Sequence, residues 1–362
     1  MELSRQDTKM TKGLAILFMV LLHLFCRKAD LPYEVFLRVG SVPLVYYIGL
    51  FGDCCVAIYC FCSGYAHYLL KEKEGRGYFL KSMQRLLLLL VNYWIVILIF
   101  WPASLLTEHA GTTVYSSAWL FQKGAELIKL LAVYKIFNGA HWFMMTYILL
   151  VLLSAPVFRL VRKVHPAVLL AAAAGIYVVS YLLRFEKITV DMHGHPFAGW
   201  AFRQAYLLGT ALLPYTAGML FYRLKVFTRI NGLYARLPRF AGPALLLAFF
   251  LGMFAAHAVF QSLIVAPLTG IGTVICFNLW KKPKPVLAVF DFFGTHSTNI
   301  WLTHMFFFDT MFVNLVFLAR YPLPILLFTL ALSLAASYLV MLFHKPLAGF
   351  IGKRLFRRAA AG

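Results

Sequence analysis

The stretch Thr11–Phe25, TKGLAILFMVLLHLF, decides the fold. From Gly13 onward it is apolar apart from one histidine, with Lys9 and Lys12 before it and Arg27-Lys28 directly behind it. A basic start followed by an apolar run is typical of a secretory signal peptide, but no small-residue cleavage site follows this one. We therefore interpret the stretch as a retained first membrane helix.

The rest of the chain repeats this pattern. Of its 362 residues, 62% are hydrophobic and 13% are charged, whereas soluble domains carry about a quarter charged residues. The bilayer must therefore be part of the solvent for this chain. Because one crossing needs ~20 apolar residues, we expect an all-α, polytopic membrane bundle of about ten transmembrane helices. The predicted spans are 10–28, 43–70, 84–104, 140–159, 166–183, 203–222, 241–258, 261–280, 296–319 and 322–343.

The basic residues predict the orientation of these helices. The chain has 34 Lys and Arg against 13 Asp and Glu, a formal net charge of +21. Most of the Lys and Arg fall in alternate loops, so the positive-inside rule places both termini in the cytoplasm. Topology and attraction to anionic lipid account for most of the excess, and no nucleic-acid partner is expected.

The domain organisation follows from the same pattern. No internal repeat is visible, so we expect one membrane domain over 1–362, with its core at 10–350 and a basic cytosolic tail at 351–362. Segment 116–137 is amphipathic, and we expect it to lie along the outer membrane interface rather than to cross.

Lys12 and His23 form the first candidate site. They are eleven residues apart on the first predicted helix, so they share one face within about 20° and are separated by ~16 Å along the axis. Lys12 is expected at the cytosolic surface and His23 deep in the membrane. This geometry suits a ligand with an anionic head and a reactive tip on a long arm, such as a coenzyme A thioester. The structural alternative is a hydrogen-bonded histidine with a snorkelling lysine.

Asn299 and His304 form a second group on the ninth predicted span. They belong to a polar string that runs from Asp291 to Asp309. Ionisable groups at membrane depth are costly and therefore functional candidates. Hydrogen bonding between helices is the alternative.

Two shorter motifs complete the candidates. Lys81 and Arg85 are four residues apart on a basic cytosolic stretch, where one helical face could grip phosphates. Their alternative role is the positive-inside signal alone. Ser63-Gly64-Tyr65 ends the second span, and small residues at this position also let helices approach closely.

No metal site is expected. The six cysteines fall inside apolar runs without zinc-ligand spacing, which is typical of small packing residues. His193-Gly194-His195 in an outer loop is the remaining histidine pair, and two histidines without further ligands are weak evidence for a metal.

Taken together, these motifs resemble the bacterial acyltransferase-3 family of integral-membrane O-acyltransferases. The likeness runs from about residue 8 to residue 350, and it departs from the family pattern in two places. The entry to the third helix has Lys81, Arg85 and leucines where the family usually has two close arginines and a proline. His344-Lys345 stands before Pro346, where the family often has an acidic residue. The motifs that carry the resemblance are 11–23, 57–65, 78–94, 141–143, 293–304 and 338–346.

The resemblance implies a multi-pass enzyme of the bacterial cytoplasmic membrane. It would move an acyl group, most often acetyl, from cytosolic acyl-coenzyme A to a hydroxyl of a cell-envelope carbohydrate or lipid-linked glycan, with acetyl-CoA as co-substrate and no permanently bound cofactor. By this analogy His23 is catalytic, as a general base or as a transient acyl carrier. The donor-binding residues would be Lys12, Lys81 and Arg85, and the residues that line the cavity or orient the acceptor would be Ser63, Tyr65, Asn299 and His304.

Other functions fit a polytopic chain with buried polar groups. A secondary transporter predicts internal repeats with broken helices in matching halves, and a flippase for a lipid-linked sugar needs no acyl chemistry. A sensor or structural membrane protein would use the polar residues only to join helices.

Overall fold

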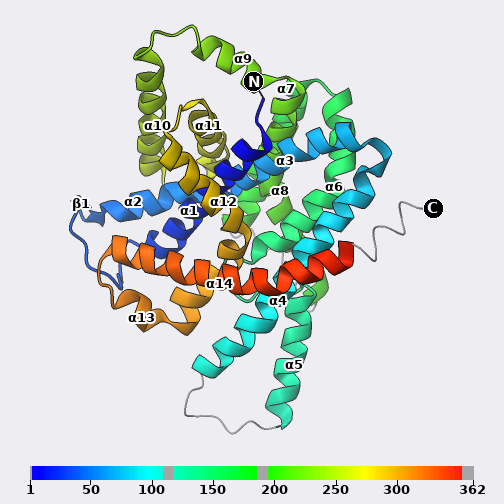
Figure 1. Ribbon diagram of the computed structural model, residues 1–362, viewed down its shortest axis with the longest axis vertical. Coiled ribbons are helices and arrows are strands. Elements are labelled where there is room, and N and C mark those ends of the chain that lie inside the picture. Colours follow the sequence, from blue (N-terminus) through cyan, green and yellow to red (C-terminus); the bar gives the residue numbers. More distant parts are fainter. Residues whose placement is uncertain (1, 109–116, 186–194, 353–362) are drawn as a thin grey trace. The chain divides into compact units, whose positions relative to one another are not determined.

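Figure 1 shows the computed structural model of the chain, which describes residues 2–108, 117–185 and 195–352. His193, Gly194 and the expected basic tail from residue 353 onward lie outside the described residues. The described chain is helical, with one two-stranded hairpin whose strands are two residues each. In chain order the elements are α1 (Arg5–Phe25), β1 (Arg38–Val39), β2 (Val42–Pro43), α2 (Leu44–Phe51), the 3₁₀ turn η1 (Gly52–Cys54), α3 (Cys55–Glu74), the 3₁₀ turn η2 (Gly75–Gly77), α4 (Tyr78–Glu108), α5 (Ser117–Leu131), α6 (Trp142–Lys163), α7 (Pro166–Phe185), α8 (Pro196–Arg223), α9 (Val226–Tyr234), α10 (Ala241–Phe260), the 3₁₀ turn η3 (Leu263–Val265), α11 (Ala266–Leu279), α12 (Lys284–Met305), the π-helical turn η4 (Phe306–Met311), α13 (Val313–Phe317) and α14 (Pro322–Ile351).

The helices confirm that the chain is a polytopic helical membrane protein. Among the described residues, six helical segments are long and apolar enough to cross a membrane. One of them joins α2, α3 and α4, and the helices α8, α11 and α12 are not among the six. The six segments are Arg5–Phe25, Leu44–Thr107, Trp142–Lys163, Pro166–Phe185, Ala241–Phe260 and Pro322–Ile351.

The chain forms two compact units. Unit 1 comprises Met1–Lys28, Leu37–Leu80 and Met145–Ser297, and unit 2 comprises Ala29–Phe36, Lys81–Met144 and Thr298–Gly362. Three of the five dividing points fall inside α4, α6 and α12, and the other two lie between α1 and β1. We describe each unit by itself, and the expectation of a single membrane domain stays a prediction.

The second predicted span, 43–70, is not one continuous α-helix. It consists of α2 and α3 joined by η1. A side chain at Gly52 would collide with the carbonyl oxygen of Phe18, so this residue must lack a Cβ for η1 to lie against α1. The 3₁₀ turn therefore lies at a close approach of two backbones, which a glycine permits.

The ninth predicted span, 296–319, was placed too far along the chain. The helix begins at Lys284, with Pro285 in its first turn, where proline is favoured. It ends at Met305, and the π-helical turn η4 and the short α13 follow. The hydropathy pattern of the sequence predicted only the later, apolar half of α12. The earlier half carries Asp291, whose charge is paired with Lys9 at 2.6 Å.

Unit 1 is built around the crossing of α3 and α8. A Cβ at Gly64 would collide with the backbone carbonyl of Tyr215, and one at Gly218 would collide with that of Phe61. These glycines let the two backbones touch, which confirms the packing interpretation of Ser63-Gly64. Helix α8 also packs against α7, and α1 packs against α2 and α3.

Unit 2 contains α5, α13, α14 and the parts of α4 and α12 that begin at Lys81 and Thr298. Tyr93 and Trp94 of α4 donate hydrogen bonds to the carbonyl oxygens of Leu130 and Leu131, at 3.0 and 2.8 Å. These bonds join α4 to the last turn of α5, where carbonyl oxygens lack partners within the helix, and Leu130 O also accepts from Val133 N at 2.9 Å. Helix α5 is not among the six candidate spans, and its interfacial location stays a prediction.

Candidate functional site

Helix α1 carries Lys12 and His23 on one continuous element. Ser4 caps its start, since the Ser4 hydroxyl accepts from Asp7 N and the Asp7 carboxylate accepts from Ser4 N. The helix runs without interruption to Phe25. The structure therefore confirms the predicted spacing of Lys12 and His23, about three turns on one face. Both residues are partly exposed, and His23 lies in the last turn of the helix.

The turn around Lys12 is joined to two other helices of unit 1. Tyr59 of α3 donates a hydrogen bond to the Lys12 carbonyl oxygen at 3.3 Å. Asn278 of α11 donates to the Thr11 hydroxyl at 3.1 Å. These bonds fix the helix at Lys12, and the residue as a whole is partly exposed.

Ser63 and Tyr65 are held by hydrogen bonds within unit 1. The Ser63 hydroxyl donates to the carbonyl oxygen of Tyr59, one turn earlier, at 2.7 Å. The Tyr65 hydroxyl donates to the Glu2 carboxylate at 2.6 Å and accepts from Leu3 N at 2.9 Å. The other Glu2 oxygen accepts from the backbone and hydroxyl of Thr228 in α9. Tyr65 thus ties Glu2 to α3, and its predicted role at an acceptor stays a prediction.

Lys81 and Arg85 lie one turn apart on α4 and are exposed. An exposed pair of cations at this spacing can contact an anionic ligand together. They belong to unit 2, whereas Lys12 belongs to unit 1.

Asn299 and His304 are buried in unit 2 and have different hydrogen bonds. The Asn299 amide oxygen accepts from Asn92 at 2.6 Å, and its nitrogen donates to the Ser337 hydroxyl at 3.0 Å. His304 Nδ1 lies 2.8 Å from Ile300 O and 3.0 Å from Trp301 O. Carbonyl oxygens only accept, so Nδ1 carries the hydrogen and a neutral ring has its lone pair on Nε2.

The predicted site residues therefore divide between the units. Unit 1 holds His23, Lys12, Ser63 and Tyr65, and there Ser63 and Lys12 both bond to Tyr59. Unit 2 holds Lys81, Arg85, Asn299 and His304. Asp309 of the predicted polar string is exposed in η4.

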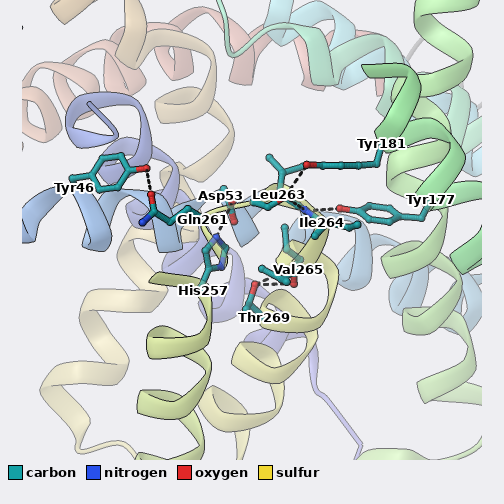
Figure 2. Close-up of polar contacts among 12 residues, drawn as sticks. Tyr46, Asp53, Tyr177, Tyr181, His257, Gln261, Leu263, Ile264, Val265 and Thr269 are labelled. Atoms are coloured by element: carbon teal, nitrogen blue, oxygen red, sulfur yellow. Dashed lines mark hydrogen bonds and ion pairs between the residues drawn. The ribbon is translucent and has the colours of Figure 1, made fainter. Parts of the chain in front are cut away.

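A buried pair that the sequence did not predict lies in unit 1 (Figure 2). Asp53 of η1 and His257 of α10 are 3.1 Å apart, measured from Oδ2 to Nε2, and their side chains are 4% and 0% exposed. In the sequence, Asp53 and His257 are each a single polar residue inside an apolar run. This pattern is the signal that could have identified them as candidates. The two are 204 positions apart, so only the packing of α10 shows that they meet.

The turn after α10 is held in place by tyrosines (Figure 2). Tyr46 of α2 donates to the Gln261 side-chain oxygen at 3.3 Å. From α7, the Tyr177 hydroxyl bonds to Leu263 O, and the Tyr181 hydroxyl lies 2.7 Å from that of Ser262. The turn that follows His257 is thereby joined to two other helices.

The described residues include no group of three or more His, Cys, Asp or Glu that could hold a metal ion. All six cysteines are free thiols, and all except Cys26 are buried. Their burial confirms the interpretation as packing residues.

The fold defines a polytopic helical membrane protein with histidines buried in its helices, and such residues are candidates for functional sites. Residues 9–342 match the family described as the acyltransferase domain of acyltransferase family 3. Because this match covers most of the chain, the protein belongs to that family and is a membrane acyltransferase. No curated protein and no solved structure matches the chain.

Proposed function

We propose that the protein transfers an acyl group, acetyl by preference, from cytosolic acyl-coenzyme A to a hydroxyl of a cell-envelope carbohydrate or lipid-linked glycan. The observation that carries this proposal is the line from Lys12 to His23 on α1 in a member of an acyltransferase family. Lys12 supplies a cation at one end of this ~16 Å line, and His23 supplies a nucleophilic imidazole at the other. These two groups match the phosphate and thioester ends of the donor.

The proposed topology puts the donor-binding residues on the cytosolic side of the membrane, where acyl-coenzyme A would bind. We propose about ten crossings, with both termini cytoplasmic in a bacterial cytoplasmic membrane. Lys12 then faces the cytosol together with Lys81 and Arg85, which would also bind the donor phosphates. His23, at the other end of α1, acts on the thioester. Ser63, Tyr65, Asn299 and His304 are proposed to line the cavity or orient the acceptor.

The test is acetyl transfer from radiolabelled acetyl-CoA by the purified full-length chain, offered a panel of cell-envelope glycans. We expect His23→Ala to lose about 10²-fold or more of the transfer rate. His165→Ala is the matched control, because His165 is an exposed histidine between α6 and α7, and its rate should stay within twofold of the parent, as is usual for an exposed site. A folded His23→Ala chain that transfers as well as the parent would refute the assignment.

The donor assignment has a separate test. Lys12→Ala, Lys81→Ala and Arg85→Ala should each raise the KM for acetyl-CoA. None should change the KM for acetyl-pantetheine, which lacks the nucleotide phosphates. Equal effects on both donors would exclude phosphate binding by these residues.

The orientation can be tested by cysteine labelling in a Cys26→Ser background. Arg27→Cys and Arg76→Cys should react from opposite sides of sealed vesicles. Labelling of both from one side would contradict the topology. Uptake of substrate into vesicles without acylated product would instead support a transporter.

A further inference from the structure

The Asp53–His257 pair is a buried titratable group that the chemistry at His23 does not use. Asp53 is 6% exposed and His257 is 1% exposed. His257 Nε2 lies 3.1 Å from Asp53 Oδ2. With Asp53 ionised, its carboxylate only accepts, so Nε2 carries the hydrogen and a neutral imidazole has its lone pair on Nδ1.

Each partner also keeps a second polar atom without a hydrogen bond. Within the described residues, Asp53 Oδ1 and His257 Nδ1 are both buried and have no partner. Unsatisfied buried polar atoms reduce stability, and apolar side chains of similar volume would pack as well or better. One nitrogen oriented by a carboxylate and the other with an open lone pair is the arrangement of a general base.

The pair lies beside the turn of α1 that carries His23. Gly52, the neighbour of Asp53, packs against the carbonyl of Phe18 and is within van der Waals reach of Leu22 Cβ. A Cβ at Gly49, in the same segment, would lie 3.1 Å from the backbone of Phe25 and Cys26, which follow His23. Asp53 is therefore placed against the end of α1 at which the acyl group is handled.

We propose that His257 is the general base that activates the acceptor hydroxyl, with Asp53 as its positioning residue. This inference rests on the proposed acyl transfer and assigns the two chemical steps to two histidines. In the first step a ring nitrogen of His23 attacks the thioester carbon, the C–S bond breaks, and the coenzyme A thiolate takes the proton released by the His23 ring.

In the second step the acceptor oxygen attacks the acyl carbon and gives its proton to His257 Nδ1. The C–N bond to His23 breaks, and His257 returns the proton to the nitrogen that leaves. Asp53 holds the Nε2–H tautomer and stabilises the transient imidazolium. The sum of the two steps is an ester and coenzyme A, with both histidines restored.

The test compares acceptors that need a base with one that does not. The purified full-length chain is given radiolabelled acetyl-CoA with water and N-acetylglucosamine as oxygen acceptors, or with hydroxylamine. Hydroxylamine is nucleophilic without deprotonation, and water and hydroxylamine are the smallest of the three acceptors. Acetohydroxamate is counted above a reaction without protein, which removes the direct reaction of hydroxylamine with the thioester.

We expect His257→Gln and Asp53→Asn to lose about 10²-fold of oxygen transfer while acetohydroxamate formation stays within about threefold of the parent. His23→Ala should lose both. Oxygen transfer within about threefold of the parent in His257→Gln would overturn the inference. A parallel fall of both products in folded variants would also overturn it, because that result describes a structural role.

A second variant guards against misfolding. The double variant Asp53→Leu/His257→Leu replaces the pair by apolar side chains and is expected to fold as well as the parent. It should show the same selective loss of oxygen transfer. A parent chain that releases no coenzyme A with any acceptor would refute the proposed function itself, and the base assignment with it. That failure appears in the parent, so it is distinct from a failure confined to the His257 variants.

Discussion

The Asp53–His257 pair of unit 1 and the Asn92–Asn299–Ser337 cluster of unit 2 both join helices that are far apart in the sequence, and both are buried. In the cluster, Asn299 uses both ends of its amide, accepting from Asn92 and donating to Ser337. In the pair, one oxygen and one nitrogen have no partner among the described residues. Satisfied buried networks hold elements in one arrangement, whereas unsatisfied groups call for another explanation. The comparison therefore indicates a structural role for the Asn299 cluster and makes the Asp53–His257 pair a candidate for a catalytic role.

The largest expected effect on stability comes from breaking the pair. Asp53→Ala leaves His257 buried without its carboxylate, and we expect it to lower the free energy of unfolding by about 3 kcal/mol. Equilibrium unfolding in mixed micelles measures this change. The double variant Asp53→Leu/His257→Leu is the control and should recover most of the loss. If the double variant is less stable than Asp53→Ala, the pair is structural, and the contrast with the Asn299 cluster disappears.

Breaking the Asn92–Asn299–Ser337 cluster should lower the free energy of unfolding somewhat less than breaking the pair. Unlike the double variant of the pair, a double variant of the cluster should not recover the lost stability. Asn299→Leu removes the acceptor of Asn92 and the donor to Ser337, and we expect a loss of about 2 kcal/mol in the free energy of unfolding. The same unfolding assay applies.

The matched comparison is Asn92→Leu/Asn299→Leu, which still leaves Ser337 without its donor. A satisfied network predicts that this double variant stays well below the parent in stability. Full recovery of stability would show that the cluster contributes nothing that packing could not supply.

Sequence reasoning was most successful where a local signal existed. The apolar runs predicted the helices, and the continuous α1 confirmed the spacing of Lys12 and His23. The start of α12 was missed because Asp291 interrupts the apolar pattern, although its charge is paired with Lys9. Hydropathy measures the apolar part of a helix, not the length of its hydrogen-bonded backbone.

The contacts between distant residues could not be predicted in this way. The Tyr65 hydroxyl bonds to Glu2, 63 residues away, and no local pattern around either residue predicts this contact. His257 had no motif around it, and only the packing of α10 against η1 gives it a carboxylate. A single sequence does not show which buried polar groups meet. Burying any of them costs free energy unless it forms a hydrogen bond, and the sequence does not name the partner.

The smallest expected effect extends the comparison to a charged group outside the candidate spans. Glu126 of α5 bonds to Lys123 at 3.3 Å and to Lys135. Burial alone would raise its pKa, but the hydrogen bonds from Lys135 and Lys123 outweigh burial and lower the pKa of Glu126 below its ordinary value of 4.5.

A group whose pKa is lower in the folded state adds stability above its unfolded pKa and loses it as the pH falls through the folded value. Because the side chain is 23% exposed, we expect only about 0.5 kcal/mol, measured as faster hydrogen exchange of α5 amides in Glu126→Gln at pH 7. The difference between the two chains should shrink as the pH falls below 4.5. A difference that persists unchanged in acid would show that Glu126 stabilises α5 by packing and not by its charge.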